Sequence, residues 1–168
     1  MPETVYFPAD LVSLAERVIR ENAALGRKVA LAESCTGGLV CAALTEIPGS
    51  SSVLDRGFVT YSNESKQESL GVQPDLIEAF GAVSPATAWA MAQGALRHSN
   101  ADVAVAVSGV AGPDGGTALK PVGTVVFAVA QRGDSEVNAE QKLIEGASRA
   151  EIRHHAALTA LELLLPPE

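Results

Sequence analysis

Apolar and polar positions alternate along this chain with the periods of helices and of buried strands. Leu11, Leu14, Val18 and Ile19 recur at helical spacing near the start, and β-branched residues fill short apolar runs farther along the chain. Capping residues, prolines and glycines mark the ends of these segments. We therefore predict helices at residues 8–25, 36–47, 63–70, 74–80, 85–98 and 149–165, and strands at residues 28–32, 53–62, 102–107, 121–130 and 136–145.

Four polar residues are the expected N-caps of these helices. A hydroxyl or carboxylate oxygen at the N-cap accepts a hydrogen bond from a free N–H of the first turn. The last cap belongs to a capping box that ends in Glu151, in which each side chain bonds the backbone of the other residue. The predicted caps are Asp10, Asn63, Ser84 and Ser148.

The order of the predicted elements defines the fold class. The early strands alternate with helices, which is typical of parallel βαβ units, whereas the last two strands form a hairpin through residues 132–134. We predict an α/β fold: a single three-layer domain over residues 1–168 with a mixed, mostly parallel sheet. Helices cover both faces, and a C-terminal β-hairpin is followed by a final helix.

Composition and charge narrow the classes of function. Apolar residues make up 47% of the chain and aromatic residues 4%, and the net charge is -8, so neither base stacking nor binding to a nucleic-acid backbone is expected. Two cysteines, Cys35 and Cys41, are too few for a disulfide framework. With neither a signal peptide nor a membrane span visible, we expect a cytoplasmic protein.

Polar residues and glycines gather where the first buried strand ends, within the run VALAESCTGG at residues 29–38. Open α/β sheets bind ligands at this carboxyl edge. A hydroxyl here is a candidate nucleophile or phosphate ligand, and free N–H groups can hold an anion or an oxyanion. The run is equally consistent with a capped helix that follows a small-residue turn. The candidate residues are Glu33, Ser34, Cys35, Thr36, Gly37 and Gly38.

A serine nucleophile needs a base, and Tyr61 and Lys66 are the candidates. Tyr61 ends a predicted strand and Lys66 lies one turn into the next helix, so both could face the same sheet edge. A lysine acts as a base only if burial or a nearby cation lowers its pKa. Taken alone, Lys66 is more simply a surface lysine. Cys35 is a rival nucleophile, although its side chain should diverge from that of its neighbour Ser34.

Two further groups of residues suit an anionic ligand. Arg149 and Arg153 are four residues apart on one helix face and could hold a phosphate between them, although taken alone they are more simply a solvated charged face. A glycine-rich segment after a buried strand could form a backbone nest for a phosphate, or be a flexible connection. Its candidate residues are Ser108, Gly109, Gly112, Gly115 and Gly116.

Several of these motifs, in this order, closely resemble the CinA C-terminal domain family. The motifs are AESCTGG, IPGSSSV, TYSNESK, GAVSP, SGVAGPDGGT and KPVGTV, and the resemblance covers residues 11–165. It implies a nicotinamide-nucleotide amidase, which hydrolyses the carboxamide of nicotinamide mononucleotide to nicotinate mononucleotide and ammonia. Some members carry an additional N-terminal molybdopterin-binding-like domain, and this chain resembles the stand-alone form.

The resemblance also implies roles for individual residues. Ser34 corresponds to the proposed nucleophile, and Tyr61 and Lys66 to the polar pair that supports it. Ser108 stands where members often carry threonine, and Arg149 and Arg153 match basic positions that we assign to the phosphate. The resemblance implies a small nucleotide substrate and, together with the Ala- and Leu-rich faces, a homodimer. The expected reaction requires no cofactor and no metal, and from charge and hydropathy we expect no nucleic-acid or membrane partner. The alternatives are a non-catalytic nucleotide-binding regulatory module of the CinA type and a general small-amide hydrolase.

Overall fold

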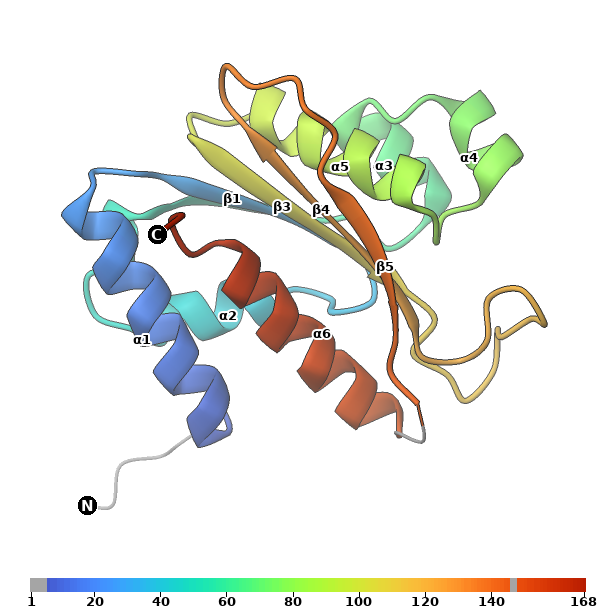
Figure 1. Cartoon of the computed structure of the whole chain (residues 1–168), viewed down its shortest axis with the longest axis horizontal. Helices are drawn as coiled ribbons and strands as arrows, with labels where there is room; N and C mark the ends of the chain where they lie inside the picture. The colour runs from blue at the N-terminus through green and yellow to red at the C-terminus, as the bar shows by residue number, and fades with distance from the viewer. Residues whose placement is uncertain (1–5, 146–147) are drawn as a thin grey trace.

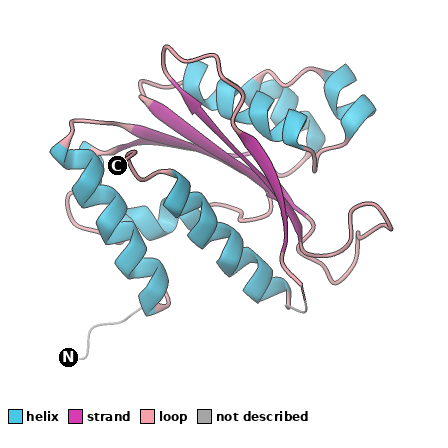
Figure 2. Ribbon diagram, viewed as in Figure 1, coloured by secondary structure: helices cyan, strands magenta, loops and turns pink. Residues whose placement is uncertain are grey.

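The structure is a computed structural model that describes residues 6–145 and 148–168, and it shows a sheet with helices on both faces (Figure 1 and Figure 2). The helices are α1 Ala9–Ala24, α2 Leu39–Thr45, α3 Asn63–Leu70, α4 Pro74–Phe80, α5 Pro85–Arg97 and α6 Arg149–Leu163. A 3-10 turn, η1, covers Ser50–Ser52, and the strands are β1 Val29–Glu33, β2 Leu54–Val59, β3 Val103–Gly109, β4 Thr124–Gln131 and β5 Ala139–Leu143.

The sheet has the strand order β2-β1-β3-β4-β5. β1 runs parallel to β2 and β3, whereas β4 runs antiparallel to both β3 and β5. This confirms the α/β fold, the mixed sheet and the terminal hairpin followed by a helix, but the described pairs divide evenly between the two orientations and are not mostly parallel. A parallel pairing needs a crossover, usually a helix, whereas residues 110–123 between β3 and β4 contain no helix and return the chain alongside β3.

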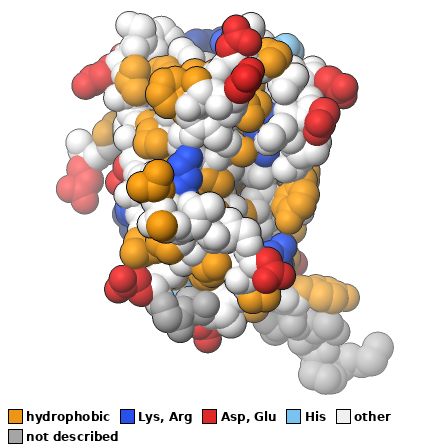
Figure 3. Space-filling view, turned by 90° about the vertical axis from the view of Figure 1, so that its right-hand side faces the viewer, with side chains coloured by type: hydrophobic (Ala, Val, Ile, Leu, Met, Phe, Trp, Pro, Cys, Tyr) orange, Lys and Arg blue, Asp and Glu red, His pale blue; other side chains and the backbone are white. Residues whose placement is uncertain are grey.

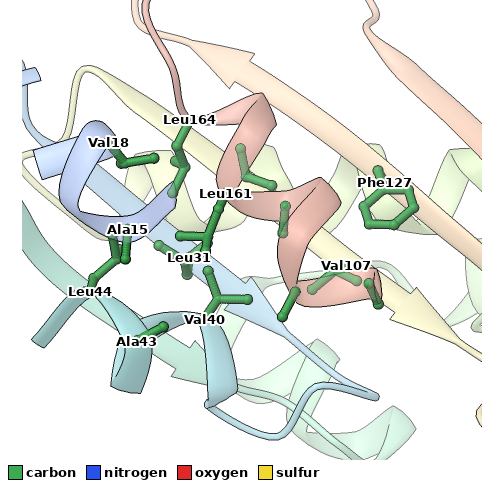
Figure 4. Close-up of a cluster of buried hydrophobic side chains, with 14 of the residues drawn as sticks. Ala15, Val18, Leu31, Val40, Ala43, Leu44, Val107, Phe127, Leu161 and Leu164 are labelled. Atoms are coloured by element: carbon green, nitrogen blue, oxygen red, sulfur yellow. The ribbon is translucent and has the colours of Figure 1, made fainter. Parts of the chain in front are cut away.

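The pleat of the strands creates two separate cores. Val29 and Leu31 point to the face covered by α1, α2 and α6, where Leu31 packs with Val40 and Leu161 (Figure 4). Ala30 and Ala32 point to the opposite face, where small side chains let α5 pack closely on the sheet. Side chains that follow β1 continue this alternation, and so they emerge on opposite sides of the sheet.

Two of the four predicted caps are confirmed and two are wrong. Ser84 and Ser148 cap α5 and α6, and Ser148 forms the predicted capping box. α3 is capped by Ser62, whose Oγ accepts from the N–H of Ser65 at 3.0 Å, so that Asn63 is already helical. Pro8 stands at the N-cap of α1, and Asp10 lies within the first turn.

Strands β2 and β5 are shorter than the predicted 53–62 and 136–145, and two further boundary differences have local causes. α2 begins at Leu39 and not at Thr36, because Gly37 and Gly38 adopt positive φ angles of 60° and 99° that lead the chain through a turn first. β4 begins at Thr124 and not at Pro121, because residues 121–124 form a turn in which the N–H of Thr124 donates to the carbonyl of Pro121 at 3.0 Å. None of the described helices is long and apolar enough to cross a membrane.

Candidate active site

Ser34 and Lys66 meet at the carboxyl end of β1. The N–H of Ser34 donates to the carbonyl of Val107 at 2.9 Å, which extends the β1–β3 ladder by one residue. Strand alternation then directs the Ser34 side chain to the α5 side, where α3 also packs. Lys66 comes from α3, and its Nζ lies 3.1 Å from Ser34 Oγ. The structure thus brings together two residues that the sequence placed 32 positions apart.

The side-chain amine of Lys66 is buried beside backbone carbonyls. Its side chain is 1% exposed, and Nζ also donates to the carbonyls of Thr60 at 2.8 Å and Tyr61 at 3.2 Å. Burial lowers the pKa of Lys66 below its ordinary value of 10.5, and no carboxylate of the described residues forms an ion pair with it. If the amine is neutral, the two carbonyls accept its two hydrogens and its lone pair can face the Ser34 hydroxyl.

Cys35 lies on the other side of the sheet from Ser34. It packs in the core under α6 and is 6% exposed. Burial raises the pKa of its thiol to about 11, although the nearby Arg153 acts in the opposite direction. A thiol is a good nucleophile only as the thiolate. The geometry therefore favours Ser34 over Cys35, in agreement with the expected divergence of their side chains.

Glu33 and Thr36 hold the start of α2. The buried Glu33 carboxylate accepts from the N–H groups of Val40 at 2.9 Å and Cys41 at 3.1 Å and from Thr36 Oγ1 at 2.7 Å. The N-cap of α2 is Gly38, which has no side chain, so Glu33 takes over the capping role from the strand. Both residues were predicted to bind substrate, but these contacts commit their side chains to the helix.

The turn after Ser34 retains unpaired backbone donors. Gly37 donates its N–H to the carbonyl of Ser34 at 3.0 Å, which closes the turn. Within residues 6–145 and 148–168, the N–H groups of Cys35, Thr36 and Gly38 have no protein acceptor. Such groups can bind a negatively charged oxygen next to the Ser34 hydroxyl.

Both predicted arginines reach this edge of the sheet, but they make different contacts. Arg149 is exposed and donates to the carbonyl of Gly112 at 2.6 Å and to the Tyr61 hydroxyl at 3.3 Å. Arg153 is half-buried and donates to the carbonyls of Cys35 and Thr36 at 3.1 and 3.2 Å. The Tyr61 side chain is 64% exposed and contacts Arg149, so Tyr61 reaches Lys66 through its carbonyl and not through its hydroxyl.

The predicted residues of the glycine-rich loop divide into two groups. Ser108 is buried and donates its hydroxyl to the carbonyl of Ala82 at 3.1 Å, while Gly109 ends β3 and Gly112 contacts Arg149. Gly115 and Gly116 are exposed in the loop between β3 and β4, which projects from the domain (Figure 1). Among the described residues, no hydrogen bond connects these two glycines to the residues around Ser34.

Thr60 belongs to the site but is not among the residues predicted from the sequence. Its carbonyl holds Lys66, and its hydroxyl is buried without a partner in the described part of the chain. By strand alternation Thr60 lies on the same side as Phe58, which packs in the core beside α5. Thr60, Ser34 and Ser108 therefore lie side by side at the carboxyl ends of β2, β1 and β3. In the sequence, the position of Thr60 two residues after Phe58 could have indicated that its side chain lies on this side of the sheet.

Metal ligands are not gathered in the same way. Across the described ranges, no three His, Cys, Asp or Glu side chains come close enough to hold a metal ion.

A model of the CinA C-terminal domain matches residues 11–166. The chain belongs to the CinA C-terminal domain family. The motifs that carry the resemblance in the sequence thus lie within a match that covers nearly the whole chain.

Relatives of this CinA-family chain differ in length and in name. A protein of Enterobacter agglomerans named nicotinamide-nucleotide amidohydrolase PncC is 48% identical over 155 residues, which cover 90% of this chain and 93% of that relative. A CinA-like protein of Syntrophotalea carbinolica is 47% identical over 152 residues, covering 90% of this chain but 36% of the relative. The chain spans a similar share, 38% and 37%, of two further relatives.

Solved structures share the whole architecture. The crystal structure of the competence/damage inducible protein CihA from Agrobacterium tumefaciens superposes with a TM-score of 0.92 at 50% identity, covering 96% of this chain and 97% of that one. A CinA superfamily protein from Escherichia coli gives a TM-score of 0.87 at 30% identity, covering 97% and 94%. The CinA fold of this chain is therefore established independently of its sequence motifs.

Proposed function

We propose that this protein hydrolyses the carboxamide of nicotinamide mononucleotide to nicotinate mononucleotide and ammonia. The observation that carries the proposal is the 3.1 Å contact between Ser34 Oγ and the buried Nζ of Lys66, whose pKa is lowered by burial. The name of the Enterobacter agglomerans relative, at 48% identity over nearly its whole length, supports the choice of substrate.

In the proposed reaction, Lys66 moves protons while Ser34 forms and breaks bonds. Neutral Lys66 accepts the Ser34 proton as Oγ attacks the amide carbon. The tetrahedral intermediate then collapses, the C–N bond breaks, and Lys66 gives the proton to the departing ammonia. Water then attacks the resulting ester with Lys66 as the base again, the bond between the acyl carbon and Ser34 Oγ breaks, and Lys66 returns the proton to Oγ. The nicotinate product loses its remaining acid proton to solvent.

The turn after Ser34 supplies the stabilisation of the intermediate. Its developing oxyanion accepts hydrogen bonds from the unpaired N–H groups of Cys35 and Thr36. Removal of one such donor in other hydrolases lowers kcat by roughly 10²–10³-fold, so these groups are a large part of the proposed catalysis.

Arg149 holds the phosphate of the substrate in this proposal. Its guanidinium is exposed and lies between Gly112 and the Tyr61 hydroxyl, where an anion can replace the longer of its two contacts. The start of α2 is a less suitable phosphate site. The Glu33 carboxylate already accepts hydrogen bonds from the N–H groups of Val40 and Cys41, and its negative charge would repel a phosphate.

Ammonia release and ligand-induced stabilisation, measured together, test this function. Wild-type protein should release ammonia from nicotinamide mononucleotide and much less from free nicotinamide, and Lys66→Ala should abolish release. A rise in melting temperature with the mononucleotide but without ammonia would instead support a non-catalytic binding module. Comparable turnover of free nicotinamide would support a general small-amide hydrolase.

A further inference from the structure

Arg153 contacts the turn that follows the proposed nucleophile from the side of α6. Its Nε donates to the carbonyl of Cys35 at 3.1 Å, and its Nη2 donates to the carbonyl of Thr36 at 3.2 Å. The guanidinium also lies against Gly37, where a Cβ atom would be 3.7 Å from Nη2. One side chain therefore holds two consecutive peptide groups.

Because a peptide group is planar, fixing the direction of its carbonyl also fixes the direction of its N–H. In a trans peptide the C=O and the following N–H point in opposite directions. Because Arg153 draws the carbonyl of Cys35 toward α6, the N–H of Thr36 points to the other side of the sheet. Ser34 and Lys66 lie on that other side, and the Thr36 N–H has no acceptor in the ranges that the structure describes.

The second contact of Arg153 supports the same turn. Since Arg153 holds the carbonyl of Thr36, the N–H of Gly37 points away from the guanidinium and donates to the carbonyl of Ser34 at 3.0 Å. This bond closes the turn and limits its motion. Arg153 thus orients the donors around Ser34 without reaching the reacting atoms itself.

We propose that Arg153 is a positioning residue that aims the Thr36 N–H at the oxyanion, and that it does not bind the substrate phosphate. The inference rests on the proposed amidase function. The two arginines on one face of α6 then have different roles. Arg149 is exposed and contacts Tyr61, whereas Arg153 donates its hydrogen bonds to the carbonyls of the turn. The phosphate role that the sequence analysis gave to both residues is then left to Arg149.

The matched variants Arg153→Ala and Arg149→Ala test this division with two substrates. The substrates are nicotinamide mononucleotide and nicotinamide riboside, which lacks the phosphate. Arg153→Ala should lower kcat by about 10²-fold on both substrates, with KM for the mononucleotide changed less than about 3-fold, as expected for loss of an oxyanion donor. Added guanidinium ion should restore part of this kcat. Arg149→Ala should mainly raise KM for the mononucleotide and leave the riboside nearly unaffected.

The outcomes separate this inference from the proposed function. A loss in Arg153→Ala that is confined to the mononucleotide, or that appears mainly in KM, would overturn the positioning role while leaving the amidase in place. Equal losses in kcat with a collapsed melting temperature and no rescue by guanidinium would also overturn it, because they would indicate a purely structural contact. Absence of ammonia release by the wild type from either substrate would refute the proposed function, and this role with it.

Discussion

The groups around the Lys66 amine determine how easily it gains and loses a proton. Its amine is enclosed by Ser34 Oγ and two backbone carbonyls, with no carboxylate ion pair among the described residues. Carbonyl oxygens stabilise an ammonium less than a carboxylate does, and desolvation disfavours the charged form. A lysine in these surroundings is suited to accept and return a proton.

The pH dependence of catalysis follows from this lowered pKa. Protonated Lys66 cannot accept the Ser34 proton, so kcat should rise with pH and level off once Lys66 is neutral, with a midpoint below 10.5. Lys66→Arg keeps a cation of similar length that does not lose its proton, and so it should be inactive across the same range. The measurement is a pH–rate profile for both proteins, with circular dichroism as the control for folding. A substantial rate in Lys66→Arg, or a rate independent of pH, would contradict the role of Lys66 as base.

Two packed helices determine where Lys66 lies. α3 carries Lys66 and packs on α5, and the two helices come close together at Gly94, where a Cβ atom would overlap the carbonyl oxygen of Leu70. The absence of a side chain at Gly94 thus sets the distance between the two helices, and with it the position of Lys66 relative to β1.

Gly94→Ala should therefore affect both stability and catalysis from a position outside the site. The new methyl group should push α3 outward, lower stability by about 1–3 kcal/mol and, by displacing Lys66 from Ser34, lower kcat by up to about 10²-fold. Thermal unfolding and ammonia release measure the two effects. Gln93→Ala, on the neighbouring position of α5, is the control and should change neither. A Gly94→Ala protein that is destabilised but fully active would show that the α3–α5 distance does not position the base.

At the scale of the whole molecule, the fold was more predictable from sequence than the site. The helices on both faces and the hairpin followed from apolar periods and turn residues, because these signals are local. Ser34 could be selected because polar residues at strand ends gather at one edge of an open sheet. Lys66, which taken alone is more simply a surface lysine, was selected through the resemblance to the CinA C-terminal domain family. The equal share of antiparallel pairs was missed because the orientation of β4 depends on a loop connection between neighbouring strands.

The roles of Glu33 and Arg153 could not be read from sequence spacing. Glu33 caps α2 because the pleat directs its side chain to that face of the sheet, and a glycine occupies the N-cap position. Arg153 reaches the carbonyl of Cys35 across 118 positions of the chain. Both facts depend on how α2 and α6 pack on the sheet, which local patterns do not specify.

The homodimer stays a prediction. The chain does offer apolar surface: Leu76, Trp89 and Val137 are among the residues that line a groove of about 550 Å³, and Val137 is 66% exposed. Figure 3 shows hydrophobic side chains interspersed with acidic ones on one face of the molecule. Surfaces of this kind accompany association in many proteins but also occur in monomers.

The central claim is that Ser34 is the nucleophile of an amidase, and ammonia release by three matched proteins tests it most directly. Wild-type protein, Ser34→Ala and Cys35→Ala are incubated with nicotinamide mononucleotide at equal concentration, after unfolding curves have established that all three are folded. Wild type and Cys35→Ala should release ammonia at similar rates, whereas Ser34→Ala should lose at least about 10³-fold. Release by Ser34→Ala at a rate near that of the wild type, or its loss in a folded Cys35→Ala protein, would contradict the account.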